Sequence, residues 1–186
     1  RASADMVLLS DSFASIVGGV RLGRRIFANL RRALTYVTAI HIPIAGLALA
    51  PILLGRPPLL FPMHVVLMEL AIDPICALVF EAEPSEAQAM KRRPRRPDEA
   101  LFGARQVALA LAQGFVVLAG VLGLYLWALG AYPEPAARGA AFLALVLGNL
   151  VLALTDSAGG GSLLAPHRRA YWIIALAIGG LLALIL

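Results

Sequence analysis

The chain has 186 residues, of which 60% are hydrophobic and 15% are charged, and its mean hydropathy is +0.83. A soluble domain averages about half apolar residues, so this composition excludes an ordinary soluble domain and indicates a membrane protein with several spans. The net charge of +5 does not indicate a nucleic-acid-binding protein, because the arginines stand at the ends of apolar segments and no basic stripe is interleaved with aromatic residues.

A short apolar run, residues 5–9, comes first and is suited to one buried strand. A lone strand leaves backbone donors unpaired on both edges and needs partner strands. The rest of the chain offers none, so we expect residues 1–12 to be the remnant of a soluble domain that precedes Arg1.

An amphipathic helix is expected over residues 13–33, where Asp11 or Ser12 can cap its start. Apolar residues recur along it at intervals of three, four and seven, and arginines occupy the other face. Two interpretations fit this pattern: a stalk that runs unbroken into the membrane, or an interfacial helix that lies on anionic lipid. The unpaired strand before the helix favours a cytoplasmic stalk.

Apolar runs fill the rest of the chain and are long enough, or nearly so, to cross a membrane, which takes about 20 residues in a helix. The expected spans are residues 34–54, 59–80, 107–131, 139–154 and 171–186. The sequence therefore predicts an all-α membrane protein, with a helical bundle of about five transmembrane helices in a lipid bilayer. Residues 34–186 would form this transmembrane domain.

The segments between the expected spans alternate in charge. Residues 91–96 and 167–169 are strongly basic, as is the flank before the first span, whereas only Arg56 and Arg138 fall on the opposite side. Positive residues mark cytoplasmic loops. We therefore expect the N-terminal segment and both basic loops in the cytoplasm, and a plasma (inner) membrane as the location.

Two carboxylates, Glu69 and Asp73, lie inside the second span. Their spacing of four residues places both on one helix face, one turn apart. Acids within a span are costly and usually functional, and two neighbouring acids resist ionising together, which favours a bound cation, a shared proton or both. The alternative is a pair that is hydrogen-bonded to neighbouring helices for packing.

Pro74 follows Asp73 directly and lacks a backbone N–H, so the carbonyl of Leu70 loses its helical partner. Proline also disfavours helical geometry at the residue before it. We expect the helix to be broken or kinked at Asp73, with the free Leu70 carbonyl beside the two acids. Oxygen ligands of this kind suit a hard cation.

The first span repeats this arrangement, because Pro43 frees the carbonyl of Ala39 and His41 lies about half a turn away. His41 is a candidate ligand or proton acceptor, and the alternative is a buried, satisfied histidine. The predicted cation site therefore comprises Asp73, Glu69 and His41, with the carbonyls of Leu70 and Ala39.

Weaker polar signals lie in the later spans. Gln113 and Asn149 are expected to form interhelical hydrogen bonds, and Asp156 is expected to be a solvated charge at the end of its span. Four glycines are expected to allow close helix packing rather than chemistry. They are Gly46, Gly114, Gly120 and Gly148.

Several segments resemble a known family. Residues 4–17 closely resemble the segment that ends the phosphorylation domain of cation-transporting P-type ATPases, and residues 21–36 resemble the stalk and entry of their fifth membrane helix. Residues 69–74 resemble the sixth-helix signature of calcium-pump-like (P2-type) members, and residues 80–84 with Met90 resemble its cytoplasmic exit. The resemblance covers essentially the whole chain.

The resemblance implies a pump whose cations bind among the fourth, fifth, sixth and eighth membrane helices. Asp73 matches the sixth-helix aspartate that coordinates the transported cation, and Glu69 stands at a neighbouring ligand position, usually an asparagine in calcium pumps. His41 stands where those pumps carry an asparagine, Ile44 where they carry a glutamate and Ile72 where they carry a threonine. The loss of these oxygen ligands implies a single divalent ion, or a proton-coupled variant, rather than two calcium ions.

By this resemblance, the chain is the cation-binding transmembrane segment of an ATP-driven cation pump. Mg-ATP would act in the nucleotide-binding, phosphorylation and actuator domains, which this sequence lacks together with the N-terminal membrane helices. The chain has no Asp-Lys-Thr-Gly phosphorylation motif, so we do not expect it to hydrolyse ATP alone. The alternative is a standalone small membrane protein that acts as a passive cation channel or as a scaffold for a partner pump.

Overall fold

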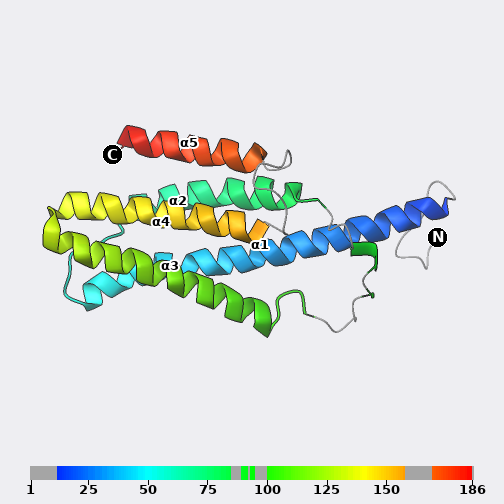
Figure 1. The fold of residues 1–186 in the computed structure, drawn as a ribbon, viewed down its shortest axis with the longest axis horizontal. Coiled ribbons are helices and arrows are strands. Elements are labelled where there is room, and N and C mark those ends of the chain that lie inside the picture. The colour runs from blue at the N-terminus through cyan, green and yellow to red at the C-terminus, as the bar shows by residue number, and fades with distance from the viewer. Residues whose placement is uncertain (1–11, 85–88, 92, 95–99, 158–168, 186) are drawn as a thin grey trace.

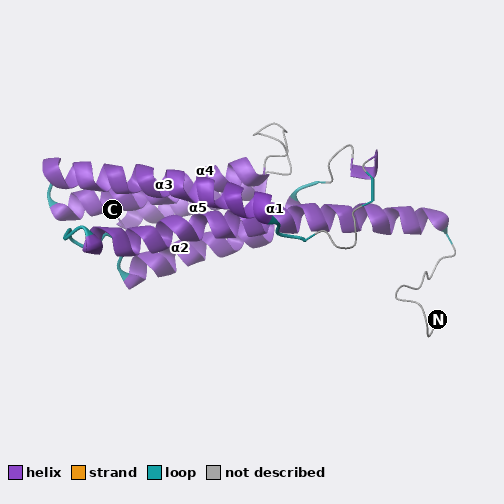
Figure 2. Cartoon of the chain, turned by 90° about the horizontal axis from the view of Figure 1, so that it is seen from below, coloured by secondary structure: helices purple, strands orange, loops and turns teal. Residues whose placement is uncertain are grey.

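The computed structural model describes residues 12–84, 89–91, 93–94, 100–157 and 169–185, and it describes the backbone alone at residues 71–73, 76–77, 170 and 181–185. The elements are α1 Phe13–Leu53, α2 Pro62–Pro74, the π-helix η1 Ile75–Phe80, the 3₁₀-helix η2 Ala89–Lys91, α3 Ala104–Ala131, α4 Glu134–Ser157 and α5 Arg169–Ile185. The predicted all-α bundle is confirmed: the helices lie side by side, and the described residues contain no strand (Figures 1 and 2). The strand expected at residues 5–9 lies outside the described residues.

Helix α1 runs for 41 residues without a break, which corresponds to about 60 Å. Its first half projects beyond the bundle along the long axis of the molecule (Figure 1). The prediction that the amphipathic segment continues into the first span is confirmed. The segment is collinear with the expected span, and its role as a stalk stays a prediction.

Helix α1 ends in a tight, hydrogen-bonded cap. Gly55 has a φ of +64°, a left-handed conformation that glycine adopts without strain. Its N–H donates to the carbonyl of Ile52 at 3.0 Å, and the N–H of Arg56 donates to the carbonyl of Pro51 at 2.8 Å. These two bonds form a Schellman motif, which turns the chain towards α2.

Helices α1, α3 and α4 form the tightly packed part of the bundle. A Cβ atom added at Gly114 of α3 would lie 2.5 Å from the carbonyl oxygen of Ala39 in α1, and one at Gly46 would lie 2.6 Å from the side chain of Leu118. Gly148 of α4 similarly approaches α3, at 3.1 Å from the side chain of Val117. Small residues that let helix backbones approach are typical of membrane bundles, where dispersion contacts replace the hydrophobic effect.

The prediction of close packing is therefore confirmed at Gly46, Gly114 and Gly148. It is wrong at Gly120, where an added Cβ would meet nothing within 4 Å. Periodicity alone does not distinguish these glycines, because the contacts depend on which face of α3 meets α1.

The second span consists of α2 followed directly by η1, and the helical stretch ends at Ala82. The predicted break at Asp73 is wrong, because α2 continues through Asp73 to Pro74, which has helical dihedral angles of φ −62° and ψ −34°; the alternative, a kink at Asp73, stays a prediction. The chain changes to π-helical bonding directly after Pro74. A π-turn joins backbone N–H and C=O groups five residues apart instead of four. The backbone hydrogen-bond pattern therefore changes where proline lacks its N–H, and the helix does not unwind.

Three helices among the described residues are long and apolar enough to cross a membrane, by length and composition: α1, α3 and α4. These match the first, third and fourth expected spans. Helix α5 carries a shorter apolar stretch, Tyr171–Gly180, and packs beside α2 and η1 at the edge of the bundle (Figure 1).

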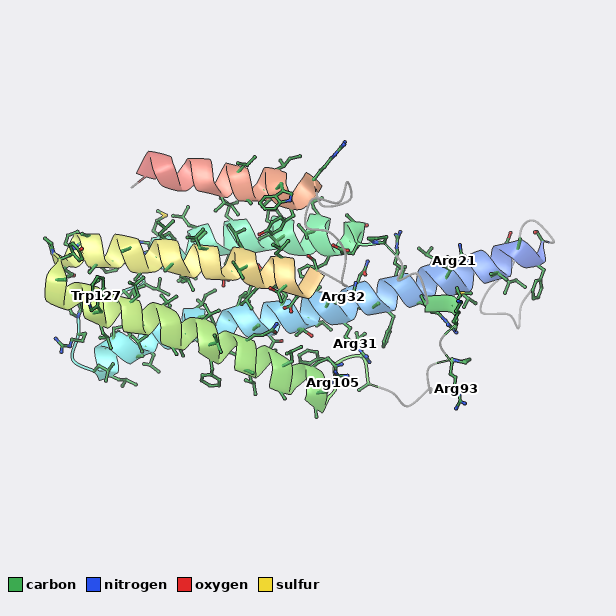
Figure 3. All side chains as sticks on the ribbon, viewed as in Figure 1. Arg21, Arg31, Arg32, Arg93, Arg105 and Trp127 are labelled. Carbon is green, nitrogen blue, oxygen red and sulfur yellow. The ribbon has the colours of Figure 1, made fainter. Side chains whose placement is uncertain are left out.

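The two ends of the bundle differ in charge. Arg21, Arg31, Arg32, Arg93 and Arg105 lie towards the end from which the stalk projects, whereas Trp127 lies near the opposite end (Figure 3). This separation agrees with the alternation of basic and non-basic segments along the sequence.

Side chains of the stalk bind the segment that follows η1. The side-chain amide of Asn29, which is buried, donates to the carbonyl of Glu83 at 2.9 Å. Arg24 donates to the carbonyl of Ala89 at 2.5 Å, and Arg31 donates through Nε to the carbonyl of Leu101 at 3.0 Å. The segment between η1 and α3 is thereby attached to the stalk at several points.

At the opposite end, α3 and α4 hold the loop between α1 and α2. The Tyr125 hydroxyl donates to the carbonyl of Pro57 at 2.9 Å, and Arg138 donates through Nε to the carbonyl of Pro58 at 3.2 Å. The Arg138 guanidinium, which also pairs with Glu134, stacks 4.5 Å above the ring of Phe61. The loop is thus fixed to the α3–α4 hairpin.

Candidate cation site

His41 of α1 and Glu69 of α2 meet where the two helices pass each other. The Nε2 atom of His41 lies 3.8 Å from Oε1 of Glu69. The two side chains are 52% and 44% exposed, so both are open to a further group. Both interpretations of His41, as a ligand or as a buried, satisfied histidine, stay predictions: its side chain is half-exposed in the described part of the chain, and its Nδ1 atom has a hydrogen-bond partner.

The other ring nitrogen of His41 fixes where its proton lies. Nδ1 is 2.7 Å from the carbonyl oxygen of Val37, one turn earlier in α1. Because a carbonyl only accepts hydrogen bonds, Nδ1 carries the proton. In the neutral ring, Nε2 therefore holds a lone pair, and it faces the carboxylate of Glu69. At a separation of 3.8 Å, a proton on Nε2, a bridging water molecule or a bound cation would each link the two groups.

The remaining predicted ligands are placed differently. Asp73 follows Glu69 by one turn in α2, but its side chain lies outside the described residues. The carbonyl oxygen of Ala39 lies beside Gly114 of α3, so the structure does not bring it together with Glu69. The Leu70 carbonyl remains a prediction. The part of the chain whose side chains are described contains no group of three or more potential metal-binding side chains.

Asn149 of α4 is a polar residue whose environment sequence reasoning missed. Its side chain is only 3% exposed, and neither its amide nitrogen nor its amide oxygen has a partner among the described residues. The expected interhelical hydrogen bond is therefore not formed with them. Buried amides are almost always satisfied, so this one is a candidate binding group. A lone amide in an apolar helix was the only signal in the sequence.

Gln113 of α3 does form the expected interhelical hydrogen bond, from Nε2 to Oδ1 of Asp156 in α4 at 2.7 Å. The expectation of a solvated Asp156 is wrong, because its Oδ2 is buried and has no partner among the described residues. The reason is that α4 extends to Ser157 and the neighbouring α3 covers its last turn. This pair lies on the α3–α4 seam, apart from His41 and Glu69.

Comparison with known proteins gives one family match and many relatives. The model of the family "Cation transporting ATPase, C-terminus" matches residues 57–186, which is more than half of the chain. The chain is 39% identical over 114 residues to the sodium/potassium-transporting ATPase subunit alpha of Hydra vulgaris, covering 61% of the chain and 11% of that relative. It is 28% identical over 153 residues to the calcium-transporting ATPase of Bacillus subtilis (strain 168), covering 81% of the chain and 17% of that relative. The matched segments are thus less than a fifth of these relatives.

Proposed function

Because the chain belongs to the family of C-terminal segments of cation-transporting ATPases, we propose that it binds the transported cation within an ATP-driven pump. The nucleotide-binding, phosphorylation and actuator domains and the N-terminal membrane helices of that pump would be supplied by other parts of the same protein, and Mg-ATP would act there. The family match and the membrane-spanning helices support this proposal.

The facing acceptors of His41 and Glu69 carry the proposal for the site. Metal–ligand distances of about 2.0–2.6 Å place two ligands of one ion about 3–4 Å apart, and the observed separation of Nε2 and Oε1 is 3.8 Å. Asp73, one turn along α2, would add a second carboxylate, and the Leu70 carbonyl a further oxygen. We propose that these groups bind one divalent cation, or the protons that replace it.

The mixed ligand set bears on which cation is transported. Ca²⁺ and Mg²⁺ prefer ligands that are all oxygen, whereas an imidazole nitrogen suits borderline divalent metals such as Mn²⁺, Fe²⁺ and Zn²⁺. The neutral, Nδ1-protonated form of His41 presents such a nitrogen. Asn149 of α4 has a buried amide oxygen without a partner among the described residues, and we propose it as a further candidate oxygen ligand.

The exposure of the site also agrees with a place in a larger protein. Ionisable groups within a span avoid lipid and face a protein partner or a water-filled cavity. The half-exposed faces of His41 and Glu69 would then be covered by other membrane helices of the pump. A site shared between two groups of helices can open towards either side of the membrane in turn.

The stalk would transmit the motion of the cytoplasmic domains to this site. His41 lies on the same unbroken helix as Asn29 and Arg31, whose side chains bind the segment after η1. A displacement of the stalk therefore moves the site and that segment together. The basic end of the bundle and the positive-inside rule support a cytoplasmic location for the stalk, and we propose the plasma (inner) membrane as the location of the pump.

The proposal is tested by phosphorylation from ATP in the full-length protein, measured against the concentrations of Ca²⁺, Mn²⁺, Zn²⁺, Mg²⁺ and H⁺. Glu69→Gln removes one carboxylate ligand, and we expect the concentration of the activating cation at half-maximal phosphorylation to rise at least about tenfold. The matched control is Glu134→Gln, because Glu134 pairs with Arg138 at the end of the bundle away from the stalk, outside the proposed site. Equal cation dependence in wild type and Glu69→Gln would overturn the site.

A further inference from the structure

A second polar pair of the membrane bundle lies outside the proposed cation site. Gln113 of α3 donates to Oδ1 of Asp156 in α4 at 2.7 Å. The remaining oxygens of the same two groups, Oε1 of Gln113 and Oδ2 of Asp156, are both buried and have no hydrogen-bond partner among the described residues. One hydrogen bond therefore links two groups that each keep a buried, unused acceptor.

An ionised Asp156 does not resolve this arrangement. A carboxylate and an amide oxygen are both acceptors, so neither can satisfy the other, whatever their exact orientation. Buried side-chain oxygens without a donor are rare in folded proteins, and a charged carboxylate within a membrane bundle requires a partner charge or a cavity. A proton bound to the carboxyl group would turn one of these acceptors into a donor.

We propose that Asp156 is a proton-binding site, in which Oδ2 carries a proton from water and donates it to Oε1 of Gln113. The acid and the amide then form two antiparallel hydrogen bonds, and both buried oxygens are used. The ligand is a proton, and the site requires no metal, because two protein oxygens are too few for a hard cation, which takes six or more ligands.

Among the described residues, no basic side chain takes the place of this proton beside Asp156. Asp156 forms no ion pair with a described base. The Arg31 side chain binds the carbonyls of Ala100 and Leu101, and the Tyr171 hydroxyl binds the carbonyl of Leu150. The other bases at this end of the packed helices are Arg32 of α1, Arg105 of α3 and Arg169 of α5.

The pair and the proposed cation site lie on different seams of the bundle, α3–α4 and α1–α2. Gly114, the neighbour of Gln113, touches Ala39 of α1, and Ala39 precedes His41 by two residues. A protonated Asp156 is neutral, so it joins α3 to α4 without adding a negative charge that would compete with Glu69 for a cation. The inference goes beyond the proposed function and does not depend on transport.

Infrared difference spectroscopy of the full-length protein in nanodiscs tests the proposal, because the carbonyl band of a protonated carboxylic acid is separate from those of carboxylates and amides. We expect the wild type to show a protonated-acid band at neutral pH that Asp156→Asn lacks. The band should move in Gln113→Leu, where its hydrogen-bond partner is gone. The band should persist in Glu69→Gln, which separates this site from the cation site.

Thermal unfolding gives a second readout. Asp156→Asn imitates the protonated acid, since its amide N–H can donate to Gln113, and its melting temperature at neutral pH should be at least that of the wild type. The melting temperature of the wild type should fall as the pH is raised until the proton leaves, whereas that of Asp156→Asn should not. The sign follows because the neutral form is favoured in the folded state, so its stabilisation is lost on deprotonation.

Three results would overturn the proposal. The first is the absence of a band that depends on Asp156. The second is loss of that band when Na⁺, K⁺ or a divalent cation is added at constant pH, which would identify a cation site instead. The third is a wild-type melting temperature that changes with pH in the same way as that of Asp156→Asn.

Discussion

Helix α1 has two sides that are built differently. Its seam with α3 is so tight that Gly114 leaves no room for a Cβ atom beside Ala39. Its contact with α2 at His41 and Glu69 is a pair of half-exposed side chains 3.8 Å apart, with no direct hydrogen bond between them. One side of the same helix is closed by packing, and the other carries a half-exposed histidine that faces a half-exposed glutamate.

The two sides of α1 therefore have different proposed roles: the close-packed side supports the bundle, and the side that faces α2 binds the cation. A close-packed seam has few alternative arrangements, because small displacements create clashes or voids. A site that must bind and release a cation needs ligands that can shift between two arrangements. We call the close-packed part formed by α1, α3 and α4 the rigid side. The contacts of Tyr125 and Arg138 with the loop between α1 and α2 extend this rigid side to the end of the bundle away from the stalk. We infer that α1, α3 and α4 hold the position of His41, while α2 supplies the side of the site that changes.

The largest effect is expected at Asp73. Asp73→Asn keeps the size of the side chain and removes its charge, so cation-stimulated phosphorylation of the full-length protein should be abolished while its expression is unchanged. Phosphorylation from ATP across a cation series measures this. A variant with the wild-type cation dependence would remove Asp73 from the site.

A smaller loss is expected at His41, which contributes one ligand among several. His41→Ala should weaken the affinity for the activating cation by about 10- to 100-fold and should shift the preference from borderline metals towards Ca²⁺. His64→Ala is the matched control, because His64 accepts a hydrogen bond from Phe61 at the start of α2, outside the proposed site. An equal loss in both variants would indicate a structural effect only.

The close packing of α1 against α3 is disrupted most directly by a substitution at Gly114. Gly114→Ala places a Cβ 2.5 Å from the backbone oxygen of Ala39, and overpacking of this kind costs about 1–3 kcal/mol. Gly120→Ala, on the same helix, meets nothing within 4 Å and should be neutral or slightly stabilising. The melting temperatures of the two purified variants measure the difference, and equal values would contradict the close α1–α3 seam.

The smallest effect is expected at the loop between α1 and α2. Tyr125→Phe removes the hydroxyl that donates to Pro57 and should cost about 0.5–1.5 kcal/mol of stability. Cation affinity should stay at the wild-type value, because the residue lies on the rigid side. Thermal unfolding and cation titration of the same preparation distinguish the two quantities, and a change of affinity alone would contradict this assignment.

Much of the fold could be predicted from the sequence, because a run of apolar residues between basic segments has few solutions in a bilayer. The continuous stalk and span of α1 followed from the apolar periodicity of residues 13–34. The backbone conformation around Pro74 could not be predicted from the sequence. Local rules give the energetic cost of a proline in a helix but not whether the chain unwinds or adopts a π-turn. The structure shows the second outcome.

The candidate site could be predicted only in part. His41 and Glu69 were both predicted as candidate ligands from their residue types and from the neighbouring prolines, and their side chains lie 3.8 Å apart; that they bind one cation stays a prediction. The burial of Asp156 and the position of the Ala39 carbonyl beside Gly114 depend on how α3 packs against α4 and α1. Such contacts between distant segments are not encoded in the spacing of residues along one helix.

The most direct test of a shared cation between α1 and α2 is a double-mutant cycle of cation affinity in the full-length protein. Affinities are measured for the wild type, His41→Ala, Glu69→Gln and the double variant. If both side chains touch one cation, their effects should deviate from additivity by at least about 0.5 kcal/mol, whereas the control cycle of His41→Ala with Glu134→Gln should be additive. Additive effects of His41→Ala and Glu69→Gln would contradict the account.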